Sequence, residues 1–207
     1  MFNSIKNHFY KKRLKDKRFN FLFDKPSNDE YICFDCETTG LDPLIDDIIS
    51  IGAVIIKNNT IIASKKFIRY VKPKSNQLKE NSIKIHHLRK CDLENACNID
   101  DVILEFLYFI GNRKIVGYFL DFDLEMINKY LKPIIGINLP NKKYEVSEIY
   151  HDFKIDLIPQ SFVDLRFKSI LNELNLPNFG THDSYNDALM TALIFIKLKN
   201  SASVKIN

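Results

Sequence analysis

Two carboxylates stand two residues apart at the end of an apolar segment, and this pair constrains the chain more than any other feature. Residues 31–36 read Tyr-Ile-Cys-Phe-Asp-Cys, a pattern typical of a buried strand. Side chains two apart on a strand project from one face, so Asp35 and Glu37 lie side by side. Two like charges in a buried place are costly unless a cation compensates them. The pair therefore predicts a divalent-metal site, because magnesium prefers carboxylate oxygens. The alternative is a pair at a strand end that faces water and caps the next turn.

A second acidic pair follows a short apolar run at residues 115–119. The pattern predicts a buried strand that ends where a helix over 122–131 begins. Asp121 is typical of a helix start, where acids are favoured. Asp123 lies just inside the expected helix and could face the first pair. Alone, this cluster is equally compatible with helix capping.

A third cluster joins His182 to Asp187 at the start of an amphipathic helix over 184–199. Apolar residues recur at helical spacing from Asp187 onward and place it on the buried face, where an unpaired carboxylate is costly. His182 could act as a general base near neutral pH. A lone histidine is more often structural, so this cluster indicates a catalytic site only in combination with the two acidic clusters.

The rest of the pattern predicts a mixed sheet flanked by helices. Strands are expected over 48–56 and 60–71 with a tight turn at Asn58-Asn59 between them, and helices over 77–87, 100–111 and 165–174. Residues 132–160 carry proline and glycine and give no assignable pattern. Three strands followed by alternating helices and strands predict an α/β fold.

Positive charge is concentrated at the N-terminus. Residues 1–19 hold seven basic residues and one acid, a net +6, while the whole chain carries +4, so the remainder carries −2. We expect a basic helical arm over 1–27, a main domain over 28–200 and a flexible tail over 201–207. A basic arm suits nucleic acid or an anionic surface. The alternative is a helix that packs its phenylalanines on the domain.

Composition excludes several classes of protein. Hydrophobic residues make up 45% and charged residues 27%, as in ordinary globular domains. No apolar run approaches the roughly 20 residues of a membrane-spanning helix, and nothing reads as a secretory signal. Cys33 and Cys36 have the spacing of a metal or redox pair, but residues three apart on a strand point to opposite faces. They are expected as buried thiols, which predicts a reducing, cytoplasmic location.

Taken together, the three clusters resemble the DnaQ-like, or DEDDh, 3′–5′ exonuclease superfamily, which includes RNase T and the proofreading epsilon subunit of bacterial DNA polymerase III. The matching motifs are Asp35-x-Glu37-Thr38-Thr39-Gly40, Phe122-Asp123, and His182 with Asp187. The resemblance covers about residues 30–199 and includes Ile85-His86, while the basic, phenylalanine-containing arm resembles that of a bacterial stand-alone subgroup. One departure is Tyr118-Phe119, where the family often has His-Asn.

The resemblance implies a ribonuclease H-like fold with a mixed five-stranded sheet, and a metal-dependent 3′–5′ exonuclease that releases nucleoside 5′-monophosphates from DNA or RNA. Asp35, Glu37 and Asp187 would hold one Mg²⁺ or Mn²⁺ ion, and Asp35 with Asp123 the second. His182 would take a proton from the attacking water. The residues expected to contact the substrate are Thr38, Thr39, Gly40, Leu41, His86, Tyr118 and Phe119.

The expected ligand is single-stranded or 3′-terminal nucleic acid, with a polymerase or another protein as a possible partner and no membrane. Two alternatives stay open. One is a non-catalytic module that uses the same fold to hold a nucleic-acid end or a partner. The other is an exoribonuclease that trims RNA.

Overall fold

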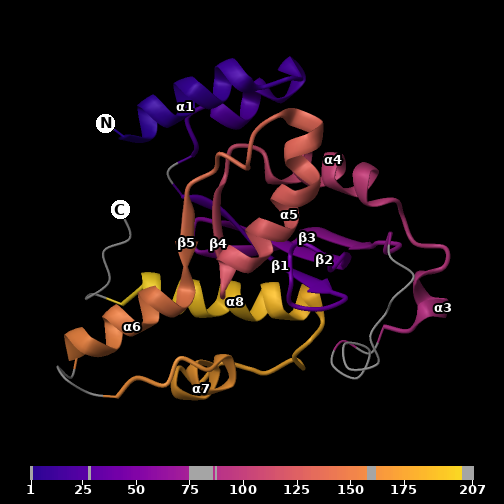
Figure 1. The fold of residues 1–207 in the computed structure, drawn as a ribbon. Coiled ribbons are helices and arrows are strands. Elements are labelled where there is room, and N and C mark those ends of the chain that lie inside the picture. Colours follow the sequence, from indigo (N-terminus) through magenta and orange to yellow (C-terminus); the bar gives the residue numbers. More distant parts are fainter. Residues whose placement is uncertain (1, 28, 75–85, 87, 158–161, 202–207) are drawn as a thin grey trace.

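A five-stranded sheet in the order β3-β2-β1-β4-β5 forms the centre of the computed structural model, which describes residues 2–27, 29–74, 86, 88–157 and 162–201 (Figure 1). The strands are β1 Glu30–Thr38, β2 Ile48–Lys57, β3 Thr60–Tyr70, β4 Lys114–Gly117 and β5 Lys143–Glu145. β1, β2 and β3 pair antiparallel, whereas β4 runs parallel to β1 and β5 parallel to β4. The expected mixed sheet is therefore confirmed.

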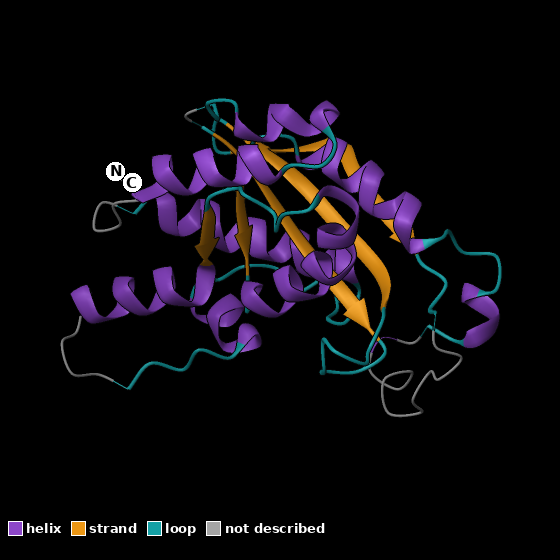
Figure 2. Ribbon diagram, turned by 45° about the horizontal axis from the view of Figure 1, so that its top comes forward, coloured by secondary structure: helices purple, strands orange, loops and turns teal. Residues whose placement is uncertain are grey.

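Helices cover both faces of this sheet (Figure 2). The helices on one face are α4 Ile99–Ile110 and α5 Leu120–Ile135, and those on the other are α6 Val146–Leu157, α7 Phe167–Glu173 and α8 Ser184–Lys199. A short helix, α3 Lys90–Leu93, precedes α4. Each face has its own apolar core, so β1 and β4 are buried on both sides. None of the described helices is long and apolar enough to cross a bilayer.

β1 divides its side chains between the two cores by strict alternation. Ile32 and Phe34 join the core under α4 and α5, and Tyr31 and Cys33 join the core under α8. Cys36 lies on the opposite face from Cys33, and both thiols are buried and free, as the sequence predicted. The same alternation directs the carboxylates at positions 35 and 37 toward the α8 face.

Most local predictions are confirmed, with differences that have physical causes. The expected last helix has the predicted bounds, and Asn58 and Asn59 both have positive φ, as a tight hairpin turn requires. The strand expected over 115–119 ends at Gly117 because Phe119 is left-handed and precedes α5. The unassigned segment 132–160 contains the three-residue β5, which is too short to show alternation. The helix expected over 77–87, except His86, and the tail over 202–207 lie outside the described residues.

The N-terminal arm lies at the end of the sheet where β1 begins, away from the end of β1 that carries Asp35 and Glu37 (Figure 1). It forms α1 Phe2–Arg13 and a 3-10 helix, η1 Lys17–Phe23. Leu14, Phe19 and Leu22 are buried in the same core as α4 and α5, and Lys15 N–H donates to the Ile135 carbonyl at 2.9 Å. The sixteen residues of α5 separate this end from its first turn by about 24 Å. Leu14, Phe19 and Leu22 of the arm are therefore structural, whatever its charges bind.

We predict that Phe19→Ala lowers the free energy of unfolding by about 3–5 kcal/mol, the usual cost of removing a buried phenylalanine ring. The Phe19 ring is 1% exposed and lies 5.4 Å from the Tyr108 ring, centroid to centroid. Phe9→Ala is the matched control, because Phe9 is 60% exposed. Urea denaturation of both variants measures the difference. Equal stability of the two variants would show that the arm does not pack on the domain.

Candidate active site

Three carboxylates from two distant segments converge where β1 ends. Asp35 and Glu37 project from β1, and Asp187 projects from the first turns of α8. One carboxylate oxygen from each residue lies within 4.8 Å of the others. This is the arrangement predicted from the first and third clusters, and it suits a bound cation because hard divalent ions prefer carboxylate oxygens.

A glycine in β2 lets α8 come this close. Gly52 is the register partner of Asp35, and a Cβ added to it would lie 2.2 Å from the Tyr185 nitrogen. Only a residue without a side chain fits there, so the start of α8 rests directly on the sheet. Next to this contact the hydroxyls of Ser50 and Ser184 are hydrogen-bonded at 2.7 Å and buried. The first turn of α8 is thereby fixed over the end of β1.

Asp123 reaches the same region from the other side of β1. It lies in the first turn of α5, is 4% exposed, and accepts a hydrogen bond from the backbone of Cys36. The negative charge of Asp123 raises the pKa of Asp35, so Asp123 acts electrostatically on the carboxylate cluster. Asp121, which the sequence offered as a helix cap, is exposed and paired with Lys143 instead.

The start of α5 is held by Glu145, a residue that the sequence analysis did not identify. Its carboxylate accepts from the N–H groups of Phe119 and Leu120 at 3.1 and 2.8 Å. It also accepts from the N–H and hydroxyl of Ser147 at 3.0 and 2.7 Å. Glu145 thus satisfies the free donors at the starts of both α5 and α6. No signal marked it, because it lies in the segment whose pattern could not be assigned.

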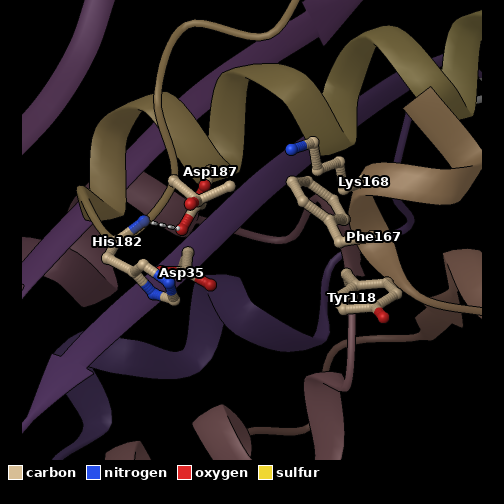
Figure 3. A pocket seen from close by; sticks show the side chains of 7 residues that line it. Asp35, Tyr118, Phe167, Lys168, His182 and Asp187 are labelled. Carbon is tan, nitrogen blue, oxygen red and sulfur yellow. Dashed lines mark hydrogen bonds between the residues drawn. The ribbon is translucent and has the colours of Figure 1, made fainter. Parts of the chain in front are cut away.

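A cavity of about 300 Å³ opens beside the carboxylates (Figure 3). The residues that line it are Asp35, Tyr118, Phe167, Lys168, Thr181, His182 and Asp187. His182 and Asp35 both line the cavity, and the backbone N–H of His182 donates to Asp187 Oδ2 at 2.9 Å (Figure 3). Phe167, Lys168 and Thr181 are additional lining residues; none belongs to the three acidic motifs. The cavity therefore combines an acidic floor, an imidazole and an aromatic wall.

Burial and mutual repulsion raise the pKa of every acid in the cluster. Burial raises the pKa of Asp35 well above its usual range, and the charges of Asp123, Asp187 and Glu37 raise it further. Burial likewise raises the pKa of Glu37 to about 8, helped by the charge of Asp187. The pKa of Asp187 rises to about 6 through burial, against the hydrogen bond from His182. Burial also raises the pKa of Asp123 well above its usual range.

These shifts fit a site built for cations. Without a compensating charge the raised pKa values disfavour ionisation of all four acids at once, and a bound cation reverses this by favouring the carboxylates. A second observation agrees: Asp187 Oδ1 is buried and has no hydrogen-bond partner among the described residues. A buried carboxylate oxygen without a donor is costly unless a ligand satisfies it. The donor set therefore fits a hard divalent ion.

The residues expected to contact the substrate divide into two groups. Tyr118 lines the cavity, Phe119 is 61% exposed beside it, and Leu41 is 85% exposed after β1. The residues that stabilise local structure instead are Thr38, Thr39, Gly40 and His86. The Thr38 hydroxyl donates to the Gly40 carbonyl at 2.7 Å, the Thr39 hydroxyl donates to buried Asp46 at 3.1 Å, and His86 Nδ1 accepts from Leu88 N–H at 3.0 Å. Substrate contact by either group stays a prediction.

Comparison with known sequences gives consistent results. A family model described as "Exonuclease" matches residues 32–195. The PolC-type DNA polymerase III of Thermotoga petrophila is 30% identical over 182 residues, which cover 86% of this chain but 12% of that protein. The DNA polymerase III subunit epsilon of Aquifex aeolicus is 29% identical over 171 residues, covering 81% of this chain and 79% of that one. The chain thus spans about an eighth of the PolC-type relatives and most of the epsilon subunit.

Solved structures share the fold at lower identity. Cell-death related nuclease 4 superposes with a TM-score of 0.74 at 19% identity, over 84% of this chain and 65% of that one. Exonuclease X in complex with 5′ overhanging duplex DNA superposes with a TM-score of 0.66 at 18% identity, over 84% of this chain and 94% of that one. The ribonuclease H-like architecture predicted from the sequence is confirmed by these neighbours.

We predict that Gly52→Ala reduces both stability and activity. The new methyl group would meet the backbone of Ser184 and Tyr185, which cannot rotate away, so α8 must shift. Overpacking of this kind costs about 1–3 kcal/mol, and displacing Asp187 by about 1 Å would lower the turnover number by about 10²-fold. Thermal melts and steady-state rates measure the two effects. Wild-type activity in this variant would mean that α8 does not need to contact β2.

Proposed function

This chain belongs to the exonuclease family whose model spans residues 32–195, and on that basis we propose that it is a metal-dependent exonuclease that releases nucleoside 5′-monophosphates from the 3′ end of nucleic acid. The observation that carries the proposal is the convergence of Asp35, Glu37 and Asp187, all half-buried, with one carboxylate oxygen of each within 4.8 Å of the others. A bound cation would favour the carboxylate form of this cluster, because it offsets the mutual repulsion of the acids.

The proposed ligand assignment uses all four acids. Asp35, Glu37 and Asp187 would hold one Mg²⁺ or Mn²⁺ ion, and Asp35 with Asp123 would hold a second. Bound together, two such ions stabilise the attacking and the leaving oxygen of a phosphodiester. A solved relative, exonuclease I of E. coli, is described as a zinc-bound form with single-stranded DNA, which supports metal binding on this fold.

His182 is the proposed general base. It has a positive φ of 67°, its backbone N–H is hydrogen-bonded to Asp187, and it lines the same cavity as Asp35 (Figure 3). From there it would accept a proton from the attacking water, and it would return that proton to solvent because it is exposed.

The proposed substrate is a single strand or a frayed 3′ end. The chain has no tryptophan, so packing against bases would fall to Tyr118, Phe119 and Leu41. Solved neighbours of the fold include exonuclease I with a dT13 oligonucleotide and exonuclease X with 5′ overhanging duplex DNA. We therefore favour DNA over RNA.

A polymerase is the proposed protein partner, because a subunit of DNA polymerase III is among the relatives. The proposed location is the cytoplasm, because the four cysteines are free thiols.

The test is a digestion panel of single- and double-stranded DNA and RNA with Mg²⁺ or Mn²⁺. With 5′-labelled strands we expect a ladder that shortens from the 3′ end, and with 3′-labelled strands an immediate mononucleotide. Excess chelator and the Asp35→Asn variant should each reduce hydrolysis to background. Hydrolysis by pure protein in excess chelator contradicts the metal assignment. Binding without hydrolysis would support a non-catalytic module, and preference for RNA a trimming enzyme.

We predict that His182→Ala lowers the turnover number by about 10²–10⁴-fold, the usual contribution of a general base. The affinity for Mn²⁺, measured by calorimetry, should stay close to that of the wild type because the imidazole is not an assigned ligand. His151→Ala is the matched control, since His151 is exposed on α6. A collapse of Mn²⁺ affinity in His182→Ala would make His182 a metal ligand instead.

A further inference from the structure

Lys168 lies in the wall of the catalytic cavity, opposite the acids. It is the second residue of α7, and it is the one basic side chain among the described residues that line the cavity. In Figure 3 its ammonium is directed toward the Asp187 side of the cavity. Lys168 is exposed, and it makes no ion pair or hydrogen bond through its ammonium with any described residue. A free cation therefore faces the place where the proposed substrate reacts.

The backbone around Lys168 is firmly held although its side chain is free. Asp164 accepts from the Arg166 N–H at 3.0 Å and from the Ser169 hydroxyl at 2.8 Å, on either side of Lys168. The Tyr118 hydroxyl donates to the Leu165 carbonyl at 2.7 Å, which ties this segment to the end of β4. The start of α7 thus has a fixed position relative to the acidic cluster, and so does the base of the Lys168 side chain.

A polyanionic strand needs a cation at this position. The two proposed metal ions would balance the charges of the four acids, and they would act on the phosphate that is cleaved. The next phosphate on the 5′ side would enter a cavity whose described ionisable side chains are Asp35, Asp187, Tyr118, His182 and Lys168, and of these only Lys168 carries a positive charge at all pH values near neutral. An ammonium on a flexible stem binds phosphate as a point charge.

We propose that Lys168 binds the phosphate immediately 5′ of the scissile one and holds the strand over the acidic cluster. This inference rests on the proposed exonuclease function and adds a substrate-binding residue that lies outside its three acidic motifs. The aromatic neighbours agree with this role, because the Phe167 and Tyr118 rings lie 4.7 Å apart, centroid to centroid, and form an apolar surface beside the ammonium.

The alternative role for Lys168 is that of a resident cation, an ammonium that occupies the acidic site in place of metal. Lys168 could offset the charge of Asp187 when metal is absent and move away when metal binds. The two roles differ in what removal of the ammonium does. Loss of a phosphate ligand weakens substrate binding and leaves metal affinity unchanged, whereas loss of a competing cation tightens metal binding.

The test uses the full chain with three variants. Lys168→Met removes the charge and keeps most of the stem, Lys168→Arg keeps the charge, and Lys197→Met is the control. Lys197 is exposed on α8, ten residues or about 15 Å along the helix from Asp187.

On single-stranded substrate we expect Lys168→Met to raise KM about ten-fold, as loss of one partly exposed charged hydrogen bond does. The turnover number should change little, and the slope of log KM against log salt should fall by about 0.7. Lys168→Arg should restore most of the affinity.

Methylphosphonate substitution identifies the phosphate. In the wild type, an uncharged methylphosphonate just 5′ of the scissile phosphate should raise KM, and in Lys168→Met the same substitution should add nothing. Equal effects of the substitution in both proteins, or a Lys168→Met variant indistinguishable from Lys197→Met, would overturn the proposal. Tighter Mn²⁺ binding by Lys168→Met in calorimetry would overturn it in favour of the resident cation. If the wild type hydrolyses no nucleic acid at all, the proposed function fails instead.

Discussion

The close approach of α8 to the sheet at Gly52 is the contact on which the active site depends. Asp187 is 152 residues from Asp35 in the sequence, and the two meet because a glycine opposite Asp35 leaves room for the backbone of Ser184 and Tyr185. The buried hydrogen bond between the Ser50 and Ser184 hydroxyls also holds the start of α8 against β2. A side chain at position 52 would force the helix outward and separate the carboxylates. The position of the helix start thus decides whether a metal site exists.

The fold stabilises an arrangement that is unfavourable by itself. Asp123 is buried and Asp35, Glu37 and Asp187 are half-buried, and desolvation raises the pKa of each of these four acids. Apolar packing on both faces of β1 offsets that cost, since the same strand contributes Ile32 and Phe34 to one core and Tyr31 and Cys33 to the other. Strain of this kind is typical of functional sites, where a ligand supplies the missing compensation.

α5 connects the site to the rest of the molecule. Its first turn carries Asp123 and is held by Glu145. Further along, Lys129 donates to the Asp46 carbonyl at 2.6 Å and Tyr130 donates to Asp47 at 2.6 Å, so the helix braces the loop between β1 and β2. Its last turn meets the N-terminal arm through Ile135. The arm therefore contacts α5 about one helix length from the first turn that carries Asp123.

The sequence by itself determined the fold class and predicted the acids that the structure brings together at the end of β1. Alternation in β1 placed Asp35 and Glu37 on one face, helical periodicity placed Asp187 on the buried side of α8, and both inferences use only neighbours in the chain. It could not supply Glu145, because a three-residue strand has no readable pattern, nor Lys168, because an exposed lysine looks like any other. The contacts of Glu145, the position of Lys168 in the cavity wall and the approach of α8 to Gly52 were decided only by the tertiary structure. Hydrophobic periodicity reports which side of an element faces a core, whereas contacts between distant elements depend on packing that no local pattern encodes.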